Sequence, residues 1–123
     1  MNLNLVGHLV ERVAFDFGVT ILFDNGLEVR IETTFTVHAV DSTPVEVNPP
    51  NYQDAAARLL SVLQETVTSA HVDETTGELR LEFEGGRAIR VPSSEMFEAW
   101  SLTSLEGVRA TSLPGGSLSL WES

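Results

Sequence analysis

The sequence contains no cysteine and no lysine, and each absence excludes a kind of chemistry. Without cysteine there can be no disulfide, no thiolate nucleophile and no cysteine-ligated zinc. Without lysine there can be no Schiff-base lysine and no P-loop lysine. No window approaches the roughly 18 apolar residues that span a bilayer, and the N-terminal residues MNLNLVGHLVERV lack a basic region and a cleavage site. We therefore expect a cytoplasmic protein.

Positive charge is also scarce. Seven bases, all of them arginine, stand against 18 acids, which gives a formal net charge of −11. Such a charge repels phosphate backbones and anionic lipids, so we expect no nucleic-acid or membrane partner and favour a basic protein partner. The 123 residues, 42% of them hydrophobic, are enough for one domain with its own core, so we predict a single domain over residues 1–123.

A repeated segment is the clearest positive feature. Residues 23–31 reappear as residues 83–91, and both copies keep the order phenylalanine, acid, glycine, aliphatic, arginine, aliphatic. Apolar residues alternate with polar ones in both, which is typical of antiparallel strands with one buried face. A related strand precedes each hairpin, so we predict two three-stranded meanders, an internal repeat of about 8–40 and 65–92.

The alternation also predicts the turns. Phe23 can face an inward partner, Leu27, only if the loop has three residues, because a two-residue loop would shift the register by one. We therefore predict a G1-bulge hairpin with Gly26 in the left-handed conformation. The same reasoning predicts a three-residue loop at residues 84–86. In that register Arg80 faces Arg90, either as a clamp for a partner's carboxylate or as a surface pair compensated by neighbouring glutamates.

The segment between the repeats carries three prolines in residues 41–51, which we expect to break any strand. Asn51 is a predicted helix N-cap with Asp54 three residues on, and a connecting helix is predicted over about 52–65. Its apolar face, expected to cover a sheet face, consists of Tyr52, Ala56, Leu59, Leu60 and Leu63.

The predicted fold is α+β and mostly antiparallel β: two pseudo-repeated meanders joined by that helix, followed by a C-terminal hairpin over about 106–122. The turn of the hairpin is Pro114-Gly115-Gly116, and residues 97–102 lead into a strand. We expect Trp100 and Trp121 to pack in the core. The pattern leaves open whether the meanders share one sheet or face each other.

No arrangement of residues indicates catalysis, a cofactor or a metal. His8, His38 and His71 show none of the spacings of metal-binding motifs, and there is no GxSxG or phosphate-binding glycine motif. His38 and His71 could meet only if the repeats packed edge to edge. Alternating glutamates such as Glu78 and Glu82 are typical of a solvated sheet surface rather than of an acid–base pair. We therefore predict a protein that is not an enzyme.

Several short motifs carry a resemblance to a known group of proteins. The chain has a glycine at position 7, a GxLxLxFxxG hairpin at residues 77–86, the sequence FEAWSL at 97–102 and PGG at 114–116. In these it resembles a family of small uncharacterised bacterial proteins with an (Y/F)EAWxL motif and a closing PGG strand. Members look like the immunity proteins that accompany polymorphic toxins. The resemblance implies a cytoplasmic inhibitor of a toxin domain, and no catalytic residues.

Charge and resemblance together predict a non-catalytic acidic binding protein that neutralises a basic toxin domain, acting as a monomer or homodimer. Acidic residues on exposed strand faces would steer the partner and pair with its arginines and lysines. The residues expected to meet the partner are Glu28, Glu32, Glu78, Arg80, Glu82, Glu84 and Arg90. Two alternatives stay open: a small-molecule-binding or enzymatic domain with its site between the repeats, and a self-associating module that pairs through edge strands.

Overall fold

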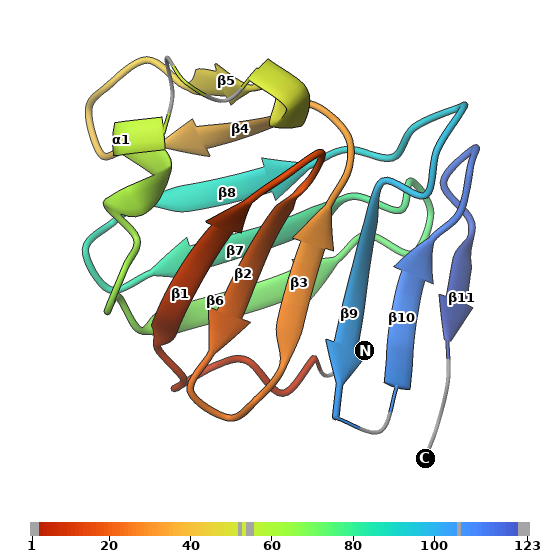
Figure 1. Cartoon of the computed structure of the whole chain (residues 1–123), viewed down its shortest axis with the longest axis horizontal. Coiled ribbons are helices and arrows are strands. Elements are labelled where there is room, and N and C mark those ends of the chain that lie inside the picture. Colours follow the sequence, from red (N-terminus) through yellow and green to blue (C-terminus); the bar gives the residue numbers. More distant parts are fainter. Residues whose placement is uncertain (1–2, 52, 54–55, 106, 121–123) are drawn as a thin grey trace.

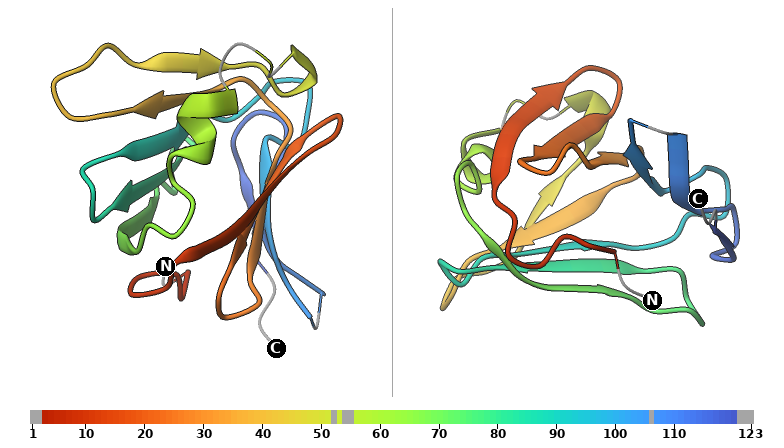
Figure 2. Two further views of the ribbon diagram at one scale, coloured as in Figure 1. Left: turned by 60° about the vertical axis from the view of Figure 1, so that its left-hand side comes forward. Right: turned by 90° about the horizontal axis from the view of Figure 1, so that it is seen from below.

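The computed structural model describes residues 3–51, 53, 56–105 and 107–120, and folds them into two antiparallel sheets that face each other (Figures 1 and 2). One sheet has six strands in the order β1-β2-β3-β9-β10-β11, and the other has five in the order β5-β4-β8-β7-β6. The strands are β1 (Val10–Phe15), β2 (Val19–Phe23), β3 (Glu28–Ile31), β4 (Phe35–His38), β5 (Val45–Val47), β6 (Val67–Val72), β7 (Leu79–Phe83), β8 (Ala88–Val91), β9 (Trp100–Ser104), β10 (Gly107–Ser112) and β11 (Leu118–Leu120).

The two hairpin turns have the predicted three-residue loops. In the first, the Phe23 amide donates to the Leu27 carbonyl at 2.9 Å, and Gly26 has a φ of 86°. In the second, Gly86 has a φ of 87°. The left-handed conformation suits glycine because it has no Cβ to clash with its own backbone. The predicted register is confirmed as well, since Arg80 lies opposite Arg90.

The meanders lie in different sheets, which answers the question that the sequence left open. β1, β2 and β3 belong to the six-stranded sheet, whereas β6, β7 and β8 belong to the five-stranded one. After each meander the chain crosses to the opposite sheet, so that β4 pairs with β8 and β9 pairs with β3. Each half of the molecule therefore completes the sheet of the other half, and the two meanders face each other as a sandwich.

The contact between the two halves is itself symmetric. Leu9 and Thr66, which occupy equivalent places at an offset of 57, form an antiparallel bridge. Equivalent bonds surround it: Gly7 N to Val67 O and Gln64 N to Val10 O, both 2.8 Å; and Val10 N to Glu65 O and Val67 N to His8 O, at 3.1 and 2.9 Å. Both edge strands also carry a bulge at the equivalent position, after Val10 and after Val67. The repeats therefore share backbone geometry as well as sequence.

Apolar side chains fill the space between the sheets. Phe23, Phe35 and Trp100 are the largest of the fully buried residues. The Trp100 indole Nε1 donates to the Gly77 carbonyl at 2.9 Å, which ties β9 to the turn that precedes β7 in the opposite sheet. Burial on this scale is the main favourable term of folding, and the described apolar side chains between the meanders form a packed core.

The connecting helix is far shorter than predicted, so an α+β fold is not confirmed and the described chain is mostly antiparallel β. The helical elements are η1 (Pro49–Asn51) and α1 (Ala56–Leu60), and the predicted Tyr52 and Asp54 lie outside the described residues. After α1 the bonds run from residue i to i−3, as from Val62 N to Leu59 O at 3.2 Å. This tighter spacing buries Leu59 and Val62 and leaves Leu60 and Leu63 partly exposed. The turn ends at Gln64, whose φ is 65°.

Two further predictions concern the segments on either side. The expectation that prolines exclude a strand from residues 41–51 is wrong, because β5 occupies Val45–Val47 at a sheet edge, between Pro44 and Pro49. The C-terminal hairpin is present: the Leu113 amide donates to the Ser117 carbonyl at 2.8 Å around the Pro-Gly-Gly turn. Trp121 lies outside the described residues.

Candidate functional site

The residues predicted to meet a partner fall on opposite outer faces of the sandwich. Glu28 and Glu32 belong to β3 and its end, on the six-stranded sheet. The other five belong to the hairpin of β7 and β8 in the five-stranded sheet: Glu78, Arg80, Glu82, Glu84 and Arg90. The structure therefore brings the second group together and separates it from the first, as the two layers in Figure 2 show.

Each arginine of the second group already holds a glutamate. Arg80 Nε lies 3.0 Å from Glu82 Oε1, and Arg90 Nη2 lies 2.9 Å from Glu78 Oε1. About half of each arginine side chain is exposed, 49% for Arg80 and 53% for Arg90. This geometry fits a surface pair of arginines whose like charges are compensated by neighbouring glutamates, which is the second of the two interpretations of Arg80 and Arg90. Exposed pairs of this kind contribute only about 0–1 kcal/mol, so a partner can exchange them at little cost.

A hollow of about 440 Å³ opens at one end of this outer face. Its charged lining residues are Glu46, Glu78 and Arg90, and the remainder are Thr33, Thr34, Phe35, Thr36 and Pro92. Glu46 lies on the edge strand β5 opposite Thr36, which in turn lies opposite Arg90. Two carboxylates and one guanidinium leave the hollow with one net negative charge. Its chemistry suits a cationic side chain.

Glu46 was not among the residues predicted from the sequence. It is exposed and has no ion-pair partner among the residues that the structure describes. The signal that could have found it is the alternation Val45-Glu46-Val47, which the surrounding prolines obscured.

The face of the six-stranded sheet is organised around Arg30. Its guanidinium lies 2.9 Å from Asp16 Oδ1 and 3.0 Å from Glu32 Oε1, and it donates to Thr20 Oγ1 at 3.0 Å. The hydrogen bond from Arg30, followed by one from the Gly18 amide, lowers the pKa of Asp16 below its usual range. The same two carboxylates raise the pKa of Arg30. Glu32 is therefore already paired with an arginine of its own chain, although it is exposed. Glu28 is exposed too, and it has no ion-pair partner among the described residues.

The histidines do not converge. β8 and β7 separate His38 on β4 from His71 on β6, a distance of about 14 Å at ordinary strand spacing. His8 Nδ1 lies 2.8 Å from Asp24 Oδ1. In the described part of the chain, no three histidine, aspartate or glutamate side chains are placed to hold a metal ion. No helix there is both long enough and apolar enough to cross a membrane.

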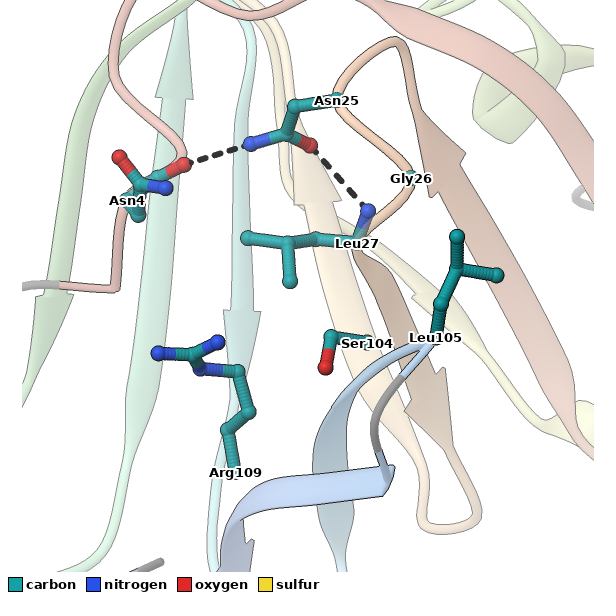
Figure 3. A pocket seen from close by; sticks show the side chains of 7 residues that line it. All are labelled: Asn4, Asn25, Gly26, Leu27, Ser104, Leu105 and Arg109. Carbon is teal, nitrogen blue, oxygen red and sulfur yellow. Dashed lines mark hydrogen bonds between the residues drawn. The ribbon is translucent and has the colours of Figure 1, made fainter. Parts of the chain in front are cut away.

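A second, smaller pocket of about 220 Å³ lies at the end of the six-stranded sheet (Figure 3). Three segments meet there: the N-terminal segment at Asn4, the β2–β3 turn at Asn25, Gly26 and Leu27, and the end of β9 with the turn after it, at Ser104 and Leu105. Arg109 reaches into it from β10. The sequence reasoning missed this pocket because its residues come from turns that are far apart in the chain.

Comparison with known proteins places the chain in a family. No curated protein and no solved structure matches it. A family model described as a family of unknown function matches residues 1–122. Because this match covers nearly the whole sequence, the chain belongs to the family of unknown function DUF6188.

Proposed function

We propose that this protein is a non-catalytic acidic binding protein of the immunity or inhibitor kind, which neutralises a basic partner domain. The binding site is the outer face of the five-stranded sheet, where a partner's arginine or lysine side chain enters the hollow beside Glu46 and Glu78. The observation that carries the proposal is Glu46, a carboxylate without an ion-pair partner among the described residues, at the rim of a hollow of about 440 Å³.

The geometry of Glu78 supports the same role. Both hydrogen bonds from Arg90 end on one oxygen, Oε1, at 2.9 and 3.1 Å. A carboxylate can accept on both oxygens, so Oε2 is available for an incoming guanidinium or ammonium group. A cation seated between Glu46 and Glu78 would complete a charge-balanced cluster of two acids and two bases.

The net charge of −11 supports the steering part of the mechanism. An acidic protein attracts a basic partner over distances comparable to the Debye length, about 8–10 Å in ordinary buffers, and this raises the association rate. Glu84 adds an exposed carboxylate in the β7–β8 turn of the same sheet. An apolar anchor would be Val40, which is 62% exposed and lies against Gly86 of that turn.

The two alternative functions have less support. The site between the repeats, on which the small-molecule or enzymatic alternative depends, coincides with a packed core of buried apolar side chains. The experiment below also tests self-association through edge strands, because a self-associating bait would recover copies of the same protein.

The experiment is affinity purification from the native host at low salt, with the tagged full chain as bait. We expect one stoichiometric basic protein to bind the wild type and to be lost with the double variant Glu46→Gln, Glu78→Gln. Glu28→Gln is the matched control, because it removes an exposed carboxylate from the opposite face, and it should retain the partner. A bait that recovers no partner, or only copies of itself, would contradict the proposal. So would a partner lost with Glu28→Gln and kept by the double variant.

A further inference from the structure

The pocket in Figure 3 is chemically the reverse of the acidic hollow. Arg109 is its charged residue, and none of the described residues that line it is acidic. Among the residues that the structure describes, Arg109 thus faces a pocket with no carboxylate in its lining, in a chain with 18 acids and seven arginines. Four other arginines, Arg30, Arg80, Arg87 and Arg90, each lie within 3.3 Å of a carboxylate. Arg109 has no such partner among the described residues.

A bulge in β10 explains why Arg109 reaches this place. Val108 lies opposite Thr103 and Ala110 lies opposite Leu102, so Arg109 is an extra residue without a partner in the ladder. A bulge breaks the alternation of side chains and re-aims one of them, and bulges are frequent beside binding sites. Figure 3 shows the Arg109 side chain extending from β10 toward the end of the sheet at which Leu27 and Asn4 lie, where it lines the pocket.

The opposite side of the pocket is rigid and polar. The Asn25 side chain is held at both ends: its Oδ1 accepts from the Leu27 amide at 3.2 Å, and its Nδ2 donates to the Asn4 carbonyl at 2.9 Å. The Ser104 hydroxyl donates to the Gly107 carbonyl at 3.5 Å, within the strand pair that borders the pocket. Because the Asn25 side chain is already fixed, this side of the pocket loses little entropy when a ligand binds.

The remaining wall is apolar. Leu27 is almost fully buried, whereas Leu105 is 98% exposed and stands at the rim. The volume of about 220 Å³ is below the range of about 300–1,000 Å³ typical of drug-sized ligands, so the occupant is small. An arginine fork beside a leucine wall suits an acid that carries a short hydrocarbon group better than a bare inorganic anion.

We propose that the Arg109 pocket binds a carboxylate attached to a small apolar group. The guanidinium takes the carboxylate through two parallel hydrogen bonds, and the hydrocarbon lies between Leu27 and Leu105. Such a group occurs both in a free aliphatic acid and at the C-terminus of a peptide. This site is separate from the acidic hollow and does not depend on the proposed function.

The test is a titration of the full-length protein followed by amide NMR, with N-acetyl-leucine as the probe. We expect shifts confined to residues around the pocket, such as Leu27, Ser104 and Arg109. N-acetyl-leucinamide has the same shape without the charge, and it should bind at least about tenfold more weakly. The acid 4-methylpentanoate lacks the amide: weaker binding than N-acetyl-leucine indicates a peptide C-terminus as the natural ligand, and equal binding indicates a free acid.

Variants decide whether Arg109 carries the binding. Arg109→Gln should weaken N-acetyl-leucine at least about tenfold, with a spectrum otherwise like that of the wild type, since the side chain is exposed. Arg12→Gln is the matched control: it removes an exposed arginine of β1 that has no ion-pair partner among the described residues, and it should change nothing. Equal binding of acid and amide, an unaffected Arg109→Gln variant, or no binding of any probe would overturn the proposal.

Discussion

Replacing Gly77 with alanine should be one of the most damaging small changes in the molecule. Gly77 has a φ of 81°, and a Cβ there would collide with the carbonyl oxygen of Gly116, which is backbone and cannot rotate away. The Gly77 carbonyl also accepts the Trp100 indole hydrogen bond at 2.9 Å. Two turns from opposite sheets therefore meet backbone to backbone at a point that a methyl group would push apart.

The magnitude follows from a comparison with Gly115. That residue has a φ of 87° but no atom within 4 Å of an added Cβ. Gly115→Ala should therefore lose only the stability that the left-handed conformation costs a residue with a Cβ, about 1–2 kcal/mol. Gly77→Ala adds overpacking of about 1–3 kcal/mol, for a total of about 2–5 kcal/mol. The loss of unfolded-state entropy on going from glycine to alanine is the same in both and cancels.

Thermal unfolding followed by circular dichroism measures the difference. We expect Gly77→Ala to melt roughly 4–12 °C below Gly115→Ala, because each kcal/mol shifts the midpoint of a domain of this size by about 4 °C. Equal losses in the two variants would refute the reasoning, since they would mean that the Gly77 and Gly116 backbones are not in contact.

Three other predictions concern buried or hydrogen-bonded side chains. Trp100→Phe leaves the Gly77 carbonyl without its donor and a cavity beside it, so chemical denaturation should show a loss of about 2–4 kcal/mol. Ser112 is buried and its hydroxyl has no partner among the described residues, so Ser112→Ala should raise the unfolding free energy by about 1 kcal/mol; a loss would contradict this. Hydrogen bonds lower the pKa of both Asp16 and Asp73 below the usual 3.8, so these carboxylates stabilise the protein above pH 3.8, and that stability is lost as the pH falls through the lower folded-state values. The substitution Arg30→Gln should raise the pKa of Asp16, as measured by an NMR titration. The pKa of Asp73 should stay unchanged, because the backbone amides of Thr75 and Thr76 donate hydrogen bonds to that carboxylate.

The local strand features were predictable because they depend on nearby residues. Alternation of inward and outward side chains fixes the register, and Gly26 and Gly86 fix the turn, so Arg80 opposite Arg90 follows from the sequence. The crossing of β4 and β9 to opposite sheets was not predictable, because no local pattern specifies which sheet a strand joins. That crossing, through β4, positions the hollow between Thr36, Glu46 and Glu78.

The misjudged helix has a similar cause. Leu59, Leu60 and Leu63 fit a helical face by spacing alone, but the bridge between Leu9 and Thr66 requires the chain to turn into β6 soon after α1. Tertiary pairing therefore overrides local helical preference, and the 3₁₀ turns bury Val62 instead. The Arg109 pocket could not be predicted for a related reason. A bulge in β10 breaks the alternation of side chains on which strand-face predictions depend.

The most direct test of the proposed function is the association rate of the purified partner as a function of salt. If the acidic face steers a basic protein, the rate should fall roughly 10-fold or more between about 0.05 and 0.5 M salt, while dissociation changes less. Glu46→Gln should lower the rate at low salt and flatten its salt dependence, and Glu28→Gln should leave more of the dependence intact. A rate that is insensitive to salt, or equally sensitive with and without Glu46, would contradict the account.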